Sequence, residues 1–121
     1  MENSHLDYVY VVSERQRLDN HWSAPEYKGF AFDGLAAQSW CQENLDVTYV
    51  DRLKERVVEL DAYIGPKPSS RTFHDFVFLI EALKQDVWLV EGYLHCEKSA
   101  KALIHQDSQF YRYTALQRIT H

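Results

Sequence analysis

Hydrophobic residues are concentrated in two short, similar segments, DYVYVV at residues 7–12 and DFVFLI at residues 75–80. In both segments apolar side chains occupy successive positions, so an extended chain would be apolar on both faces. A strand of this kind is typical of the centre of a sheet that is covered on both sides. Because the order aromatic, aromatic, aliphatic is the same in both, the pattern predicts two equivalent central strands.

A second similarity follows each of these strands. When Gly29 is aligned with Gly92, both are followed by an aromatic residue and then, at matching offsets, by small residues and one large apolar residue. Asp33 is a good N-cap for a helix over roughly 34–44, because its carboxylate can accept hydrogen bonds from the first-turn amides. Its counterpart, Cys96, is a poorer cap. Each half therefore reads as strand, strand, helix.

The last element of each half is less clear from its pattern. Residues 47–63 carry apolar side chains at helical intervals, but their second part also alternates as a strand does. The β-branched Val57 and Val58 favour extended chain, and FYRYTALQRIT near the C-terminus has strand composition. We therefore expect a strand near residues 55–63, with the helix as the open alternative.

The segment GPKPSS separates the two halves, because prolines, glycine and serines interrupt both helix and strand. We predict an α+β fold, a tandem pseudo-symmetric repeat of two ββαβ units with antiparallel sheets and two main helices. Repeat unit one covers residues 6–64, the linker 65–71 and repeat unit two 72–121. Units this small cannot easily bury a sheet alone, so residues 1–121 should form a single compact domain with one core.

Charge and aromatic content indicate the class of partner. The formal net charge is −5, and residues 1–64 hold 12 acidic residues against 6 lysines and arginines, whereas residues 65–121 hold 6 against 7. This balance disfavours nucleic acid and anionic membranes and suits docking onto a basic protein, although mild acidity also serves solubility alone. Eight tyrosines, six phenylalanines and three tryptophans exceed the needs of a small core, so we expect some to face a partner.

Several kinds of site find no support in the sequence. Neither CxxC nor HExxH spacing occurs, and no closely spaced glycines offer a phosphate-binding turn, so we expect no metal and no cofactor. Cys96 at the start of the second helix would have a stabilised thiolate, but Glu97 beside it opposes the anion. An enzyme that uses Cys96 is therefore only a third hypothesis. The lack of a signal peptide or a long apolar stretch predicts a cytoplasmic protein with reduced cysteines.

The candidate binding residues lie between Ser13 and Glu26, which we expect to form a long polar loop between the first two strands. This segment has fourteen residues, against about four at the equivalent place in the second half, and long insertions often carry function. Its tryptophan is the natural anchor for a partner, unless it folds back over an edge of the core. The expected partner-binding residues are Arg17, Asp19, His21, Trp22 and Glu26.

The segments YVYVVSE, KGFAFDGLAAQSW and RVVELDAYI together resemble many small proteins of phages and other mobile elements. In those proteins a strand, a glycine-bearing strand and an alanine-rich helix are followed by a further strand. The resemblance covers most of each half, and its motifs form the fold and supply no catalytic residues. It implies a setting in which small acidic proteins inhibit host defence machinery or act as immunity factors against toxins.

These observations predict a non-enzymatic intracellular protein that occludes a basic surface of a host defence protein, as anti-CRISPR or anti-restriction proteins do. A toxin-immunity protein is the related alternative. A second hypothesis is a binder of a small nucleotide-like molecule in an aromatic groove between the two units, lined by Tyr8, Tyr10, Phe76 and Phe78. The same aromatic face would also allow a homodimer.

Overall fold

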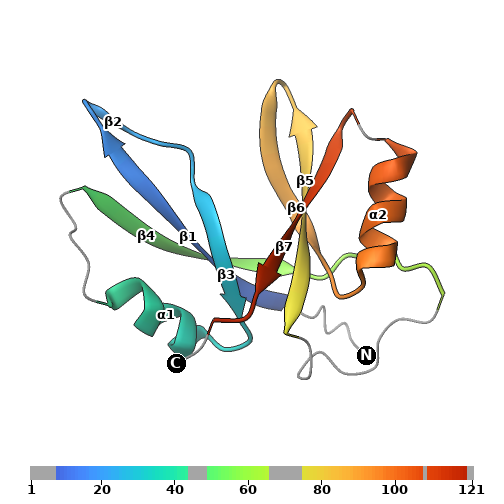
Figure 1. The fold of residues 1–121 in the computed structure, drawn as a ribbon, viewed down its shortest axis with the longest axis horizontal. Helices are drawn as coiled ribbons and strands as arrows, with labels where there is room; N and C mark the ends of the chain where they lie inside the picture. Colours follow the sequence, from blue (N-terminus) through green and yellow to red (C-terminus); the bar gives the residue numbers. More distant parts are fainter. Residues whose placement is uncertain (1–7, 44–48, 66–74, 108, 120–121) are drawn as a thin grey trace, which may run out of the picture.

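The computed structural model describes residues 8–43, 49–65, 75–107 and 109–119, and these residues form an α+β fold (Figure 1). The predicted fold class, with two helices and antiparallel sheets, is confirmed for this part of the chain. Its elements in chain order are β1 (Tyr8–Leu18), β2 (His21–Trp22), β3 (Glu26–Ala31), α1 (Gly34–Gln42), β4 (Val50–Val58), β5 (Phe76–Lys84), β6 (Val87–Leu94), α2 (Glu97–Gln106) and β7 (Tyr111–Gln117).

The two apolar segments form the central strands of two antiparallel sheets. Strand β1 lies between β3 and β4, with the short β2 paired to its far end, and β5 lies between β6 and β7. The strand order is therefore the same in both halves. Successive side chains of a strand point to opposite faces of its sheet. Val11 and Val12 in β1, and Leu79 and Ile80 in β5, are nevertheless all buried, so both faces are covered and the sequence pattern is explained.

The largest apolar cluster lies between the two sheets, and two smaller clusters lie beneath the helices. Ala37 of α1 and Ala100 of α2 are fully buried against their own sheets. Helices and inter-sheet core therefore cover opposite faces of each sheet, as Figure 1 shows with the helices at the two flanks. The inter-sheet cluster comprises Val9, Val11, Phe30, Val57, Val77, Leu79, Tyr93 and Leu116, from six strands.

The last residues of each half cross over to the sheet of the other half. The amide of Leu60 donates to the carbonyl of Tyr93 over 2.9 Å, and the amide of Ile119 donates to the carbonyl of Phe30 over 2.9 Å. Both crossings are short parallel bridges. The two sheets thus share backbone hydrogen bonds as well as apolar side chains.

Two glycines permit these crossings. A Cβ atom on Gly29 would lie 2.7 Å from the carbonyl oxygen of Gln117, and one on Gly92 would lie 2.7 Å from that of Val58. Only glycine admits such a close approach of backbone. The two glycines that the alignment paired thus have the same role in both halves, whereas descent of the halves from one duplicated unit stays a prediction.

The described part of the ambiguous region near residues 47–63 contains a strand and no helix. Strand β4 covers Val50–Val58, so it begins and ends about five residues earlier than predicted. It pairs with β1 from Tyr8 opposite Val58 to Gln16 opposite Val50. This long ladder supplies the hydrogen bonds that override the helical spacing of the side chains.

The helix boundaries follow the predicted capping. The Asp33 carboxylate accepts a hydrogen bond of 2.7 Å from the amide of Ala36, and α1 ends at Gln42. The Cys96 side chain makes no capping hydrogen bond, as expected for the poorer cap. The start of unit one, most of the linker and the start of unit two lie outside the described residues.

Candidate functional site

The predicted loop from Ser13 to Glu26 is largely a β-hairpin, so the loop prediction was wrong. Strand β1 continues to Leu18, turns at Asp19 and Asn20, and returns through β2. The sequence hid this strand because its outer half is polar on both faces and lacks an apolar alternation. We call the hairpin of β1 and β2 the first arm.

Trp22 lies against arginines of the first arm. The guanidinium carbons of Arg15 and Arg17 lie 5.4 Å and 5.6 Å from the centre of its ring. These distances are within the range of cation–π contacts. The indole is thus half-buried by its own hairpin, and the expectation that it folds over the core edge has no support in these contacts.

The structure brings four of the five predicted binding residues together at the tip of the first arm. Asp19 and His21 are exposed there, beside Arg17 and Trp22. Glu26 lies apart from them at the start of β3, where its carboxylate pairs with Lys28 Nζ over 2.8 Å.

The hairpin of β5 and β6 forms a second arm. Its two turn residues, Gln85 and Asp86, have φ angles of 53° and 66°, which are typical of a tight two-residue hairpin turn. Figure 1 shows the two arms diverging from the common core. Both arms carry exposed large apolar side chains, Leu18 on the first and Val87 and Leu89 on the second, and the exposed Tyr49 and Phe110 lie beside the first and second arm respectively.

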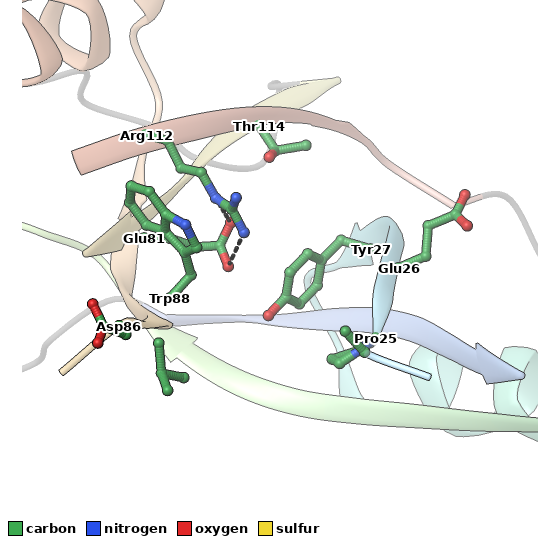
Figure 2. A pocket seen from close by; sticks show the side chains of 10 residues that line it. Pro25, Glu26, Tyr27, Glu81, Asp86, Trp88, Arg112 and Thr114 are labelled. Carbon is green, nitrogen blue, oxygen red and sulfur yellow. Dashed lines mark hydrogen bonds and ion pairs between the residues drawn. The ribbon is translucent and has the colours of Figure 1, made fainter. Parts of the chain in front are cut away.

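A cleft of about 650 Å³ lies between the base of the first arm and the second arm. We call it the arm cleft. Figure 2 shows Tyr27 projecting toward Glu81 and Arg112 from the opposite wall. Its lining residues are Ala24, Pro25, Glu26, Tyr27, Glu81, Asp86, Val87, Trp88, Arg112 and Thr114.

A buried ion pair forms one wall of the arm cleft. The Glu81 side chain is 4% exposed, and its two oxygens accept hydrogen bonds from Arg112 Nε at 2.9 Å and Nη2 at 3.4 Å. The guanidinium carbon of Arg112 lies 4.3 Å from the centre of the Trp88 ring. Arg112 therefore neutralises the carboxylate while it covers the indole, and half of its own side chain stays exposed.

The opposite wall of the cleft contributes the hydroxyl group of Tyr27 (Figure 2). Burial raises the pKa of the Tyr27 hydroxyl, and the negative charges of Glu81 and Glu55 raise it further. Arg112 acts in the opposite direction without cancelling them. At this hydroxyl the two carboxylates thus outweigh Arg112, although Glu81 is paired.

Sequence reasoning missed the residues of this cleft. Glu81 gave one signal, because it stands on the same alternating positions as Val77 and Leu79 and so falls on the core side of an apolar strand. A charge at such a position predicts a buried partner, which Arg112 supplies. Nothing in the spacing of the sequence predicted that Tyr27 would face this pair.

The predicted aromatic groove between the units does not form from its four residues. Tyr10 packs beneath α1, whereas Phe78 contacts Tyr113 beneath α2. Their alternating neighbours, and not these aromatics, face the other sheet. Tyr8 lies edge-on to Tyr10, and Phe76 is exposed.

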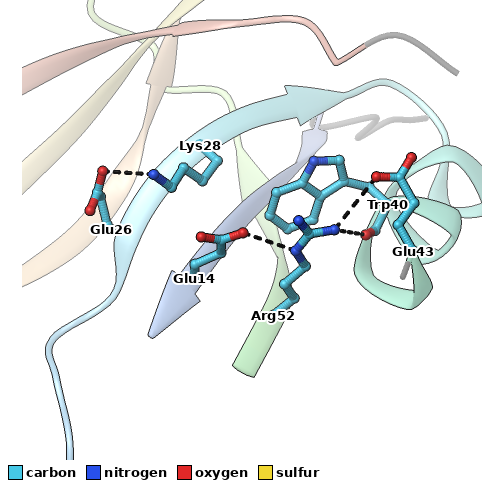
Figure 3. Close-up of polar contacts among 6 residues, drawn as sticks. All are labelled: Glu14, Glu26, Lys28, Trp40, Glu43 and Arg52. Atoms are coloured by element: carbon cyan, nitrogen blue, oxygen red, sulfur yellow. Dashed lines mark hydrogen bonds and ion pairs between the residues drawn. The ribbon is translucent and has the colours of Figure 1, made fainter. Parts of the chain in front are cut away.

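Some acidic residues of the first half are paired with cations of the same half. Figure 3 shows Arg52, whose Nε donates to Glu14 over 2.9 Å and whose Nη1 donates to the carbonyl of Trp40 over 2.8 Å. The same Nη1 lies 3.5 Å from the Glu43 carboxylate. These contacts tie α1 to its sheet, and they leave the net charge of the first half unchanged because Arg52 belongs to the same half.

A second buried polar group lies where the two halves cross. His95 Nε2 lies 2.9 Å from Glu59 Oε2, with the two side chains 2% and 1% exposed. The Tyr63 hydroxyl donates to the same carboxylate and accepts a hydrogen bond of 2.8 Å from the His95 amide. Burial and then the Glu59 hydrogen bond raise the pKa of Tyr63. This group links the end of the first half to the second half.

The thiol of Cys96 meets only part of what the enzyme hypothesis requires. The backbone amide of Ser99 lowers the pKa of Cys96, whereas burial raises the pKa of Cys41. The adjacent His95, however, is engaged with Glu59. Among the described residues, no three His, Cys, Asp or Glu side chains are grouped to hold a metal ion. No helix within the described ranges is long and apolar enough to cross a membrane.

Comparisons with known proteins assign no family to the chain. No protein-family model matches it, and neither a curated protein nor a solved structure matches it significantly. The resemblance to small phage and mobile-element proteins is untested by these comparisons and stays a prediction.

Proposed function

We propose that the protein is a non-enzymatic binding protein that uses its two arms to occupy a surface of another protein. In the version we favour it inhibits a host defence protein in the host cytoplasm, as an anti-CRISPR or anti-restriction protein does. A toxin-immunity protein would work by the same physical means. The single observation that supports the proposal best is the exposure of large apolar side chains on both arms.

The backbone of two of these residues is fixed by hydrogen bonds to the arms. The amide of Leu83 donates to the carbonyl of Phe110 over 2.8 Å, and the amide of Arg17 donates to the carbonyl of Tyr49 over 2.7 Å. The exposed aromatic rings of Phe110 and Tyr49 therefore stand beside their arms on fixed backbone. Apolar groups that are exposed and ordered lose little entropy on binding, which favours an interface.

The partner would present a basic surface. The net charge of −5 and the excess of carboxylates in the lining of the arm cleft both favour a positively charged partner. The same charge disfavours direct binding of nucleic acid. Occlusion of a basic surface that normally holds nucleic acid is the simplest way in which such a protein inhibits a nuclease.

The experiment compares two exposed leucines. Leu89 on the second arm is 48% exposed and Leu35 on α1 is 82% exposed, so Leu35→Ser is the matched control for Leu89→Ser. Immobilised wild-type protein and both variants are incubated with the same host lysate, and each captured protein is quantified by mass spectrometry.

We expect Leu89→Ser to reduce the captured partner at least about fivefold, corresponding to about 1 kcal/mol, and Leu35→Ser to leave it unchanged. Both variants should keep the wild-type melting temperature. Equal capture by all three proteins would refute an arm-based interface. The activity of the captured protein, measured with and without its inhibitor, then distinguishes a defence factor from a toxin.

A further inference from the structure

The arm cleft carries a more specific inference about the partner. We propose that this largely apolar cleft binds an arginine side chain that a basic segment of the partner protein inserts between the arms. The inference rests on the proposed function, because it names the group that the partner would contribute.

The cleft already shows how it holds a guanidinium. Arg112 is bound by both oxygens of Glu81 and lies over the indole of Trp88. Paired contacts with a carboxylate and stacking on an aromatic ring are the preferred environment of arginine. Tyr27 provides a second aromatic surface across the cleft, as Figure 2 shows. Arg112 already occupies both Glu81 oxygens and the Trp88 ring, so an entering guanidinium would stack on Tyr27 and pair with the exposed carboxylates of Glu26 and Asp86.

Charge complementarity selects a cation as the occupant. The lining includes the carboxylates of Glu26, Glu81 and Asp86 against the cation of Arg112, and Lys28, which pairs with Glu26 over 2.8 Å, still leaves one negative charge in excess. Burial is the main cause of the raised pKa of Tyr27, and the negative charges of Glu81 and Glu55 add to it. An anionic ligand would have to compete with Glu81 for Arg112, and it would be repelled by Asp86.

The dimensions suit one side chain and its flanking backbone. A volume of about 650 Å³ falls in the range of about 300–1,000 Å³ in which small groups are bound. The apolar lining by Pro25, Val87 and Trp88 suits the methylene groups of arginine, and the carboxylates suit its head. Lysine offers the same charge without the planar stacking, so it should bind more weakly.

The test uses the full chain and small peptides as probes. Acetyl-Gly-Arg-Gly-amide and its citrulline counterpart, which is neutral and nearly isosteric, are titrated into isotope-labelled protein followed by NMR. We expect the arginine peptide to shift the indole N–H of Trp88 and the amides of Ala24 and Thr114, and the citrulline peptide to leave them in place. Absence of shifts, equal shifts with both peptides, or shifts spread evenly over the surface would each overturn the proposal.

A pair of matched variants localises the binding. Asp86 has a positive φ angle, which asparagine tolerates, so Asp86→Asn removes the charge without backbone strain. We expect it to raise the Kd of the arginine peptide about twofold to fivefold, as loss of one partly solvated charge pair should. Asp61→Asn makes the same change at an exposed site outside the arm cleft and should leave the Kd unchanged. Equal effects of the two variants would show non-specific attraction and overturn the proposal.

Glu81→Gln gives the stronger test where it folds. The variant removes the buried carboxylate, so the Kd should rise more than in Asp86→Asn, and thermal unfolding checks that the fold is intact.

Failure of the two proposals can be separated. If Leu89→Ser abolishes partner capture while no arginine peptide binds, the arms form the interface and the cleft inference is wrong. If the peptide binds and capture ignores Leu89, the arm interface is wrong.

Discussion

Replacing Gly92 by alanine should destabilise the fold strongly, because this glycine lies where the first half crosses onto β6. The added Cβ would lie 2.7 Å from the carbonyl oxygen of Val58 and 2.7 Å from Cγ of Leu60. A normal contact between these atoms exceeds 3 Å, so the crossing backbone has to move away. That movement strains or breaks the hydrogen bond of 2.9 Å from Leu60 to Tyr93.

The magnitude follows from these contacts. Overpacking of a tight site costs about 1–3 kcal/mol, and loss of one buried hydrogen bond adds about 1 kcal/mol. Reduced freedom of the unfolded chain returns about 0.4–1 kcal/mol to the alanine variant. We therefore expect Gly92→Ala to lower the free energy of unfolding by about 1–3.5 kcal/mol.

Urea unfolding followed by circular dichroism measures this loss, and Gly34→Ala is the matched control. A Cβ on Gly34 would lie 3.3 Å from the ring of Tyr10, which is a flexible side chain, and alanine is favoured in the first turn of α1. Gly34→Ala should change the stability by less than about 1 kcal/mol. A loss below about 0.5 kcal/mol for Gly92→Ala would refute the close crossing of the two halves.

Three further predictions concern the buried polar groups and the cysteines. His95→Ala removes the imidazole that contacts the buried Glu59 carboxylate over 2.9 Å and should cost about 3 kcal/mol in urea unfolding; a loss below about 1 kcal/mol would contradict a structural role for the contact. The pKa of Tyr63 is raised in the folded state, so its contribution to stability is complete below the ordinary tyrosine pKa of about 10 and is lost as the pH rises further. Tyr63→Phe should therefore show a shallower loss of stability above pH ~10 than the wild type, and parallel curves would disprove the assignment. Iodoacetamide at neutral pH should modify Cys96 several-fold faster than Cys41, because the pKa of Cys96 is lowered and that of Cys41 is raised; peptide mapping that finds equal rates would refute this difference.

The parts of the fold that the sequence predicted are those set by local chemistry. The apolar faces of β1 and β5 mark central strands because burial on both sides leaves no polar position. Asp33 marks the start of α1 because its carboxylate satisfies a free amide at short range. Gly29 and Gly92 aligned correctly because both allow a backbone to pass close by.

The parts that escaped prediction depend on pairing between distant residues. The outer half of β1 is polar, and it is a strand because β4 and β2 supply its hydrogen bonds. The start of β4 at Val50 is set by the far end of that ladder, and its own composition suggested a later start. Likewise, the position of Glu81 in an apolar strand indicates a buried charge. Its partner Arg112, however, is set by the register between β5 and β7, and this register cannot be read from the local sequence.

The topology places stability and binding at opposite ends of the same strands. The crossings lie at the C-terminal ends of β3 and β6, where Phe30 and Tyr93 accept hydrogen bonds from the other half. The arm cleft is lined by the N-terminal ends of these strands, with Tyr27 on one and Trp88 on the other. The crossings therefore join the two sheets at one end of β3 and β6 and leave them apart at the other end, where the cleft lies. Because both strands are anchored in the core, the crossings also fix the distance between the cleft walls. Substitutions at the crossings should then change stability and leave affinity per folded molecule intact, whereas substitutions on the arms should change affinity with little effect on stability.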